Sequence, residues 1–151
     1  MQHLNYWERL KSLNLMSLQR RRERYIIIHM WKVLHNRCPN DLGIKFTTTP
    51  RHGTKAILPP LVKSSSQRNQ SLYDGSFAVI GPRLWNIVPK QFHSVADPLQ
   101  FKIKLTEFLN TIPDKPPVSG YKYANTNSLL EWNENILAAK LEGRSDYLMT
   151  L

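Results

Sequence analysis

The chain has little of several residue types on which whole classes of protein depend. It contains a single cysteine, Cys38, so it can form no internal disulfide and fits a reducing compartment. Its longest apolar run, Tyr25 to Trp31, is interrupted by His29 and is far shorter than the roughly 20 apolar residues of a membrane span. The first residues lack the cationic stretch followed by an apolar one that marks a secretory signal. We therefore expect an intracellular protein, nuclear or cytoplasmic, without a membrane partner.

Acidic residues are also scarce, with 11 Asp and Glu against 21 Lys and Arg. Polymerases and nucleases hold two divalent metals with paired carboxylates, and the sequence contains neither Asp-x-Asp nor Tyr-x-Asp-Asp. A zinc site needs four ligands, whereas Cys38 stands alone, and the six-residue spacing of His29 and His35 does not place them on one helical face. Neither Gly-x-Ser-x-Gly nor a phosphate-binding loop is present. We therefore predict no catalytic residue, no metal and no cofactor, so the chain is not expected to be an enzyme on its own.

The excess positive charge lies towards the N-terminal side of the sequence. Residues 1–63 hold 12 Lys and Arg against 3 Asp and Glu, whereas residues 113–151 hold 4 against 5. Such asymmetry favours a polyanionic partner, RNA or DNA, although a generally basic, solvated surface is the alternative. The densest cluster, and the candidate nucleic-acid-binding site, consists of Arg20, Arg21, Arg22 and Arg24. These guanidinium groups either bind phosphates or form a solvated helix end.

Apolar spacing predicts a mainly α fold with two principal helices. Residues 18–36 carry an apolar stripe with the spacing i, i+3, i+4 and i+7, preceded by Ser17 as a helix cap and ended near Asn36. Residues 98–110 carry a second stripe. Shorter amphipathic helices are expected at residues 5–14 and 127–142.

Between the two principal helices the sequence predicts irregular structure and a short β-hairpin. Residues 37–55 are expected to form a loop and residues 56–58 a strand. Gly81-Pro82 is expected to form a tight turn, with the strand pair around it. The predicted organisation is a small helical domain over residues 1–110, a linker over 111–126, and an appended helix and partly ordered tail over 127–151.

Several segments, in their order along the chain, resemble a known family. The first ones are Tyr6-Trp7-Glu8-Arg9-Leu10, then Leu15, Leu18 and Arg21-Arg22, then Tyr25 to Lys32, Cys38-Pro39-Asn40-Asp41-Leu42 and Arg51-His52-Gly53. The most specific stretch is Tyr73-Asp74-Gly75-Ser76-Phe77 followed by Gly81-Pro82-Arg83-Leu84-Trp85-Asn86-Ile87-Val88-Pro89, and Phe101-Lys102-Ile103-Lys104-Leu105 closes the series. Together they resemble the segment downstream of the reverse transcriptase domain in jockey-like non-LTR retrotransposons, over about residues 4–110. Val88 departs from the pattern, because the family usually has leucine there.

The resemblance implies a non-catalytic, C-terminal fragment of an RNA-directed DNA polymerase from a mobile element. The polymerase carboxylates and the endonuclease of that family lie upstream of the matching region and are absent here, so an upstream polymerase domain of a parent protein is an implied partner. The signature residues are Phe77, Pro82, Leu84, Trp85, Asn86, Pro89 and Phe101. We expect Trp85 to organise a small core with Phe77, Leu84 and Phe101, and Asn86 to satisfy backbone groups of the turn. On this interpretation the signature serves folding rather than catalysis.

A protein-interaction module without a nucleic-acid role is the alternative function. It would use the helix that carries Tyr6 and Trp7 and the helix predicted at residues 127–142. Non-specific RNA or DNA binding through the basic helix remains the primary expectation.

Overall fold

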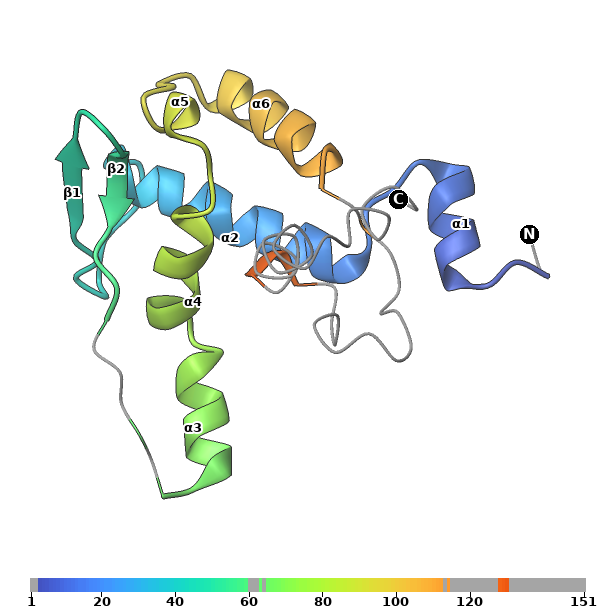
Figure 1. The fold of residues 1–151 in the computed structure, drawn as a ribbon, viewed down its shortest axis with the longest axis horizontal. Helices are drawn as coiled ribbons and strands as arrows, with labels where there is room; N and C mark the ends of the chain where they lie inside the picture. The colour runs from blue at the N-terminus through green and yellow to red at the C-terminus, as the bar shows by residue number, and fades with distance from the viewer. Residues whose placement is uncertain (1–2, 60–62, 64, 113, 115–127, 131–151) are drawn as a thin grey trace, which may run out of the picture. The chain divides into compact units, whose positions relative to one another are not determined.

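A computed structural model of the chain describes residues 3–59, 63, 65–112, 114 and 128–130. These residues form a mainly helical structure with one two-stranded antiparallel hairpin, which confirms the predicted fold class (Figure 1). The elements are α1 (Tyr6–Leu13), α2 (Leu18–Leu34), β1 (Phe46–Thr49), β2 (Gly53–Ala56), α3 (Gln67–Asp74), α4 (Phe77–Trp85), α5 (Lys90–His93) and α6 (Pro98–Asn110). None of these helices combines the length and the apolar character that crossing a membrane requires.

The chain divides into two compact units. Unit 1 comprises Met1–Arg24 and Thr106–Leu151, and unit 2 comprises Tyr25–Leu105. The division therefore falls inside α2 and α6 and does not follow the predicted boundary at residue 110. The predicted linker and the predicted helix over 127–142 lie almost wholly outside the described residues.

Helix α1 begins with a capping box, in which the Asn5 side chain accepts a hydrogen bond from the backbone of Glu8 and the Glu8 side chain accepts one from the backbone of Asn5. Asn14 ends the helix in the left-handed conformation. Only Leu10 is buried among the helix residues, whereas Tyr6 and Leu13 are about half exposed. The apolar face predicted for this segment is therefore only partly covered.

Helix α2 begins after Ser17, whose hydroxyl accepts a hydrogen bond from the Arg20 backbone at 3.1 Å, as the sequence predicted. Asn36 follows its C-terminal end with a positive φ of 56°, the expected left-handed cap. The predicted stripe is buried at Ile27, Met30 and Trp31. Because those three side chains leave water together, they hold the C-terminal half of α2 in the core of unit 2.

The hairpin is not where the sequence placed it. β1 and all of β2 except its last residue lie within the segment predicted to be a loop, and that last residue, Ala56, is where the predicted strand was to begin. Ile57 and Leu58 are about half exposed. β2 begins, directly after the turn, with Gly53 at a φ of +69°, a conformation that residues with a Cβ rarely adopt.

The Gly81-Pro82 pair does not form a turn but lies inside α4. Proline lacks the amide that would donate to the fourth preceding residue and ordinarily destabilises a helix interior by about 3 kcal/mol. Burial of Val79, Leu84 and Trp85 on the same helix opposes that penalty. A Cβ on Gly81 would come within 2.9 Å of the Met30 sulfur, so the glycine allows α4 to lie close against α2 within unit 2.

Trp85 is completely buried and organises the core of unit 2, as predicted. Its ring lies 6.1 Å from that of Phe101, which stacks on Trp31 at 5.3 Å. The prediction was wrong for Phe77, whose half-buried ring meets the edge of His29 at 5.0 Å. Two further signature residues also have structural roles, because Leu84 is buried in the core and Pro89 is the N-cap residue of α5.

The outer edge of β2 is completed by side chains instead of a third strand. Thr54 and Ala56 alternate with the residues that bond to β1, so their backbone groups point away from it. The Thr54 amide donates to His93 Nδ1 at 3.1 Å, and its carbonyl accepts from Trp85 Nε1 at 3.0 Å. The Asn86 side chain accepts from the Ala56 amide at 2.9 Å and donates to the Ala56 carbonyl at 3.0 Å. Asn86 therefore satisfies a distant strand, and the prediction that it serves its own turn is wrong.

These hydrogen bonds hold the hairpin against α4 and α5 (Figure 1). The Lys55 ammonium adds a bond to the Asn86 carbonyl at 2.6 Å, and the Lys90 ammonium donates to the Pro50 carbonyl. The signature residues Trp85 and Asn86 thus connect a helix to a strand about 30 residues away, which is a folding role.

Candidate nucleic-acid interface

The predicted arginine cluster does not present four equivalent cations. Arg20 is fully buried in unit 1, and its guanidinium donates to the carbonyls of Leu109 and Ile112 at 3.3 and 3.0 Å. Desolvation lowers the pKa of Arg20, against the attraction of Asp114 and Glu23, which raises it. A side chain so enclosed cannot reach a phosphate without leaving the core, so Arg20 is withdrawn from the candidate site.

The other three arginines differ in exposure. Arg21 and Arg22 are exposed, so their guanidinium groups can meet a polyanion from solvent. Arg24 is half-buried, and its Nε donates to the Thr106 hydroxyl at 3.1 Å within unit 1. Two of the four predicted residues thus remain open to a ligand on the first turns of α2.

A buried carboxylate accompanies Arg20 and was missed by the sequence interpretation. Glu23 accepts hydrogen bonds from the Leu129 amide at 3.0 and 3.2 Å and from the Ser128 hydroxyl at 2.9 Å. Desolvation raises its pKa, while the bonds from Leu129 and Ser128 and the charge of Arg20 lower it. The i, i+3 and i, i+7 spacing of Arg20, Glu23 and Ile27 was the available signal, because it places both ionisable groups on the stripe that Ile27 occupies.

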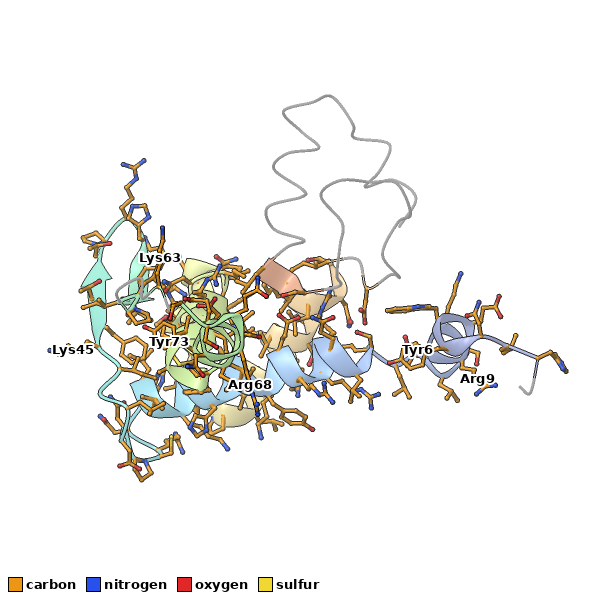
Figure 2. The ribbon with its side chains drawn as sticks, turned by 90° about the horizontal axis from the view of Figure 1, so that it is seen from below. Tyr6, Arg9, Lys45, Lys63, Arg68 and Tyr73 are labelled. Carbon is orange, nitrogen blue, oxygen red and sulfur yellow. The ribbon has the colours of Figure 1, made fainter. Side chains whose placement is uncertain are left out.

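Most of the net charge belongs to unit 2. Its residues 25–105 hold 11 Lys and Arg against 3 Asp and Glu, a net charge of +8, whereas unit 1 holds 10 against 8, a net charge of +2. Several of the unit 2 cations are exposed, and Figure 2 shows some of them at the surface. The exposed cations are Arg37, Lys45, Arg51, Lys63, Arg68, Arg83, Lys90 and Lys104. The candidate surface for a polyanion is therefore chiefly on unit 2 rather than at the arginine cluster.

Some of these cations are already held by the protein. Arg37 lies over the Trp31 ring at 5.3 Å and donates to the Ala96 carbonyl at 3.5 Å, and Lys90 bonds to the hairpin. Lys45 and Arg51, at opposite ends of β1, have side chains that remain exposed on a hairpin fixed by the core. Because their backbone is fixed, these two can present charge without first ordering a loop.

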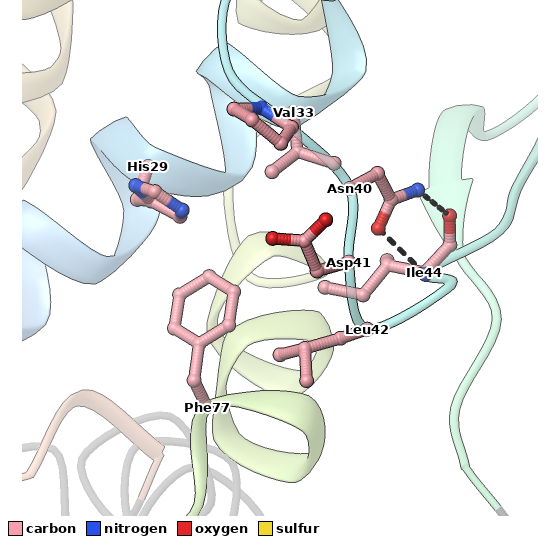
Figure 3. A pocket seen from close by; sticks show the side chains of 8 residues that line it. His29, Val33, Asn40, Asp41, Leu42, Ile44 and Phe77 are labelled. Atoms are coloured by element: carbon pink, nitrogen blue, oxygen red, sulfur yellow. Dashed lines mark hydrogen bonds between the residues drawn. The ribbon is translucent and has the colours of Figure 1, made fainter.

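A small pocket opens beside the basic surface of unit 2. It encloses about 130 Å³ and lies between α2, the loop before β1, and α4 (Figure 3). Its lining residues are His29, Val33, Pro39, Asn40, Asp41, Leu42, Ile44 and Phe77. The Asn40 side chain makes two bonds to the Ile44 backbone, at 2.7 and 2.9 Å, and so shapes the loop that carries Asp41. Two separate segments that carry the family resemblance meet here, the one from Cys38 to Leu42 and the one that ends at Phe77.

In the described part of the chain, no three His, Cys, Asp or Glu side chains are placed so that they could hold one metal ion. The Cys38 sulfur lies 3.8 Å from Nε2 of His29, a contact of two candidate ligands without a third. The lack of catalytic residues stays a prediction from the sequence.

Comparisons with known proteins add no identification. No protein-family model matches the chain, and neither a curated protein nor a solved structure is significantly similar to it.

Proposed function

We propose that the chain is a non-catalytic C-terminal piece of a reverse transcriptase of the non-LTR retrotransposon type, and that it binds RNA or DNA without sequence specificity. The resemblance of residues 4–110 supports the origin. The observation that carries the binding role is the net charge of +8 on unit 2, with most of its cations exposed. Phosphate contacts by Lys and Arg supply essentially all of the affinity in non-specific binding.

The binding role predicts a characteristic response to salt. Each phosphate contact with a single strand releases counterions and contributes about −0.7 to the slope of log affinity against log salt concentration. We expect fluorescence anisotropy with a labelled single-stranded RNA to give a slope of several units. A flat salt response, or no binding at low salt, would reject the proposal.

Charge-removal variants locate the surface. Substitution of Lys45, Arg51 and Arg68 by alanine should lower the slope by about 2 if all three contact phosphate. The matched variant in unit 1, Arg21→Ala with Arg22→Ala, should lower it by no more than about 1.4. Equal affinity and slope for the unit 2 variant and the unmodified protein would show that those cations do not carry binding.

The proposed origin has its own test, in the genome. A reading frame upstream of Met1 that encodes a Tyr-x-Asp-Asp polymerase segment is the expected finding. An intact promoter and a first exon of ordinary host type in that place would instead favour a domesticated copy, without bearing on nucleic-acid binding.

A protein-docking role is a second candidate, because large apolar side chains are exposed on and after α1. Tyr6, Leu13, Leu15 and Leu18 are each about half exposed. The helix predicted at residues 127–142, the other part of this alternative, lies outside the described residues apart from residues 128–130. Docking through apolar side chains would persist at high salt, whereas phosphate binding would not.

A further inference from the structure

The pocket of unit 2 is about large enough for one six-membered aromatic ring, and one acidic side chain lines it. Its volume of about 130 Å³ approaches that of cavities of about 150 Å³ that take a benzene molecule. Val33, Leu42 and the Phe77 ring form apolar parts of its lining. In Figure 3 the Asp41 carboxylate points into the space between His29 and Phe77.

Asp41 is available to a ligand. The described residues give its carboxylate no hydrogen bond and no ion pair, and the side chain is exposed. The neighbouring Asn40 is not available in the same way, because both polar atoms of its side chain bond to the Ile44 backbone. The pocket therefore offers one strong hydrogen-bond acceptor beside an aromatic ring.

We propose that this pocket takes a single unpaired cytosine base of a bound single strand. The proposal rests on the nucleic-acid binding proposed above. An unstacked base can insert its ring beside an aromatic side chain and present its hydrogen-bonding edge to a protein group. The exocyclic amino group of cytosine donates to carboxylates, whereas uracil presents a carbonyl oxygen at that position, which the Asp41 carboxylate repels.

The charge of the surrounding unit selects the kind of partner. Asp41 is one of only 3 acidic residues in unit 2, which also holds 11 Lys and Arg. A basic peptide, which could also place a cationic side chain against Asp41, is repelled by a net charge of +8, whereas a polyanion is attracted. The surrounding cations would hold the phosphates, and the carboxylate would choose among the bases.

The test compares labelled oligocytidylate and oligouridylate of equal length, with the full chain, at one salt concentration. Because the hydrogen bond to the charged carboxylate is available to cytosine alone, we expect oligocytidylate to bind about tenfold more tightly, which corresponds to about 1.4 kcal/mol. Asp41→Asn should bring the preference close to one, because an amide can accept from cytosine or donate to uracil. Asp74→Asn removes the same charge from α3, outside the pocket, and should leave the preference unchanged.

The outcomes separate the two proposals. If neither oligonucleotide binds, nucleic-acid binding itself fails, and the pocket proposal fails with it. Equal, salt-dependent binding of both would leave non-specific binding intact and overturn the base-selective pocket. A preference that persists in Asp41→Asn, or vanishes equally in Asp74→Asn, would also overturn it. Nuclear magnetic resonance signals of His29 and Phe77 should move with cytidine, and a shift with N-acetyl-arginine amide alone would assign the pocket to a basic peptide.

Discussion

Replacement of Asn86 by alanine tests whether side chains hold the edge of the hairpin. The substitution leaves the amide and the carbonyl of Ala56 without their partners, and Ala56 is only 4% exposed. An unsatisfied buried backbone group costs about 1–3 kcal/mol, so the two together should lower the free energy of unfolding by about 2–6 kcal/mol. For a unit of this size that loss corresponds to a fall in Tm of at least roughly 8 °C.

Urea denaturation followed by tryptophan fluorescence measures the change, since Trp31 and Trp85 both lie in the core of unit 2. Asn69→Ala is the matched control, because Asn69 is exposed on α3, and it should change the free energy of unfolding by less than about 0.5 kcal/mol. If Asn86→Ala unfolds like the control, the two bonds to Ala56 do not stabilise the hairpin and the reasoning is refuted.

Three further predictions concern Gly53, His93 and the arginine cluster. Gly53→Ala should lower the free energy of unfolding by roughly 2–3 kcal/mol in urea, because φ is +69° and the new Cβ would lie 2.8 Å from His93 Nδ1; unchanged stability would contradict this. Burial lowers the pKa of His93, with Lys55 lowering it further and the bond to Val88 raising it, so the unfolded chain takes up the proton first as the pH falls. The free energy of unfolding should therefore decrease as the pH is lowered from about 6.5, by up to about 1.4 kcal/mol per pH unit. His93→Gln should make the free energy of unfolding depend less on pH, and identical pH profiles of the two proteins would exclude His93 as the cause. Arg20→Ala should lower the free energy of unfolding by about 2–3 kcal/mol through its lost bonds, whereas Arg21→Ala should leave it within about 0.5 kcal/mol, and equal effects in urea would contradict the burial of Arg20.

The His93 prediction depends on the tautomer that the hydrogen bonds require. Its Nδ1 faces the Thr54 amide, which can only donate, and its Nε2 faces the Val88 carbonyl, which can only accept. The neutral ring with the proton on Nε2 satisfies both. A second proton on Nδ1 would oppose the Thr54 amide and break one of the bonds that complete the β2 edge.

The two principal helices followed from the sequence because their signals are local. The spacing of Phe101 and Leu105 placed α6 at Pro98–Asn110, and both side chains are completely buried. Ser17 and Asn36 marked the ends of α2 within a few residues, because each interacts with its own neighbours in sequence. Helix caps and apolar periodicity need no knowledge of the rest of the chain.

The charge of the arginine cluster could be counted from the sequence, but the exposure of each arginine could not. The count correctly indicated a strongly basic chain, but it could not tell which guanidinium faces the interior. Arg20 precedes Ile27 by two turns and so shares its buried face, whereas Arg21 and Arg22 point to solvent. The structure divides the chain at Tyr25 and Leu105, and most of the net charge belongs to that stretch rather than to residues 1–24.

By itself the sequence determined the helical class, the boundaries of α2 and α6, and the burial of Trp31, Trp85 and Phe101. Only the tertiary structure decided the hairpin and the helix through Gly81-Pro82. The strand β1 is mostly exposed and lacks the alternation of apolar and polar residues that predicts a strand. Its partner β2 is held by side chains about 30 to 40 residues further along the chain. Such contacts stabilise a strand that local propensity does not favour, and burial of α4 likewise keeps a proline inside a helix, because tertiary packing contributes more free energy than local preference.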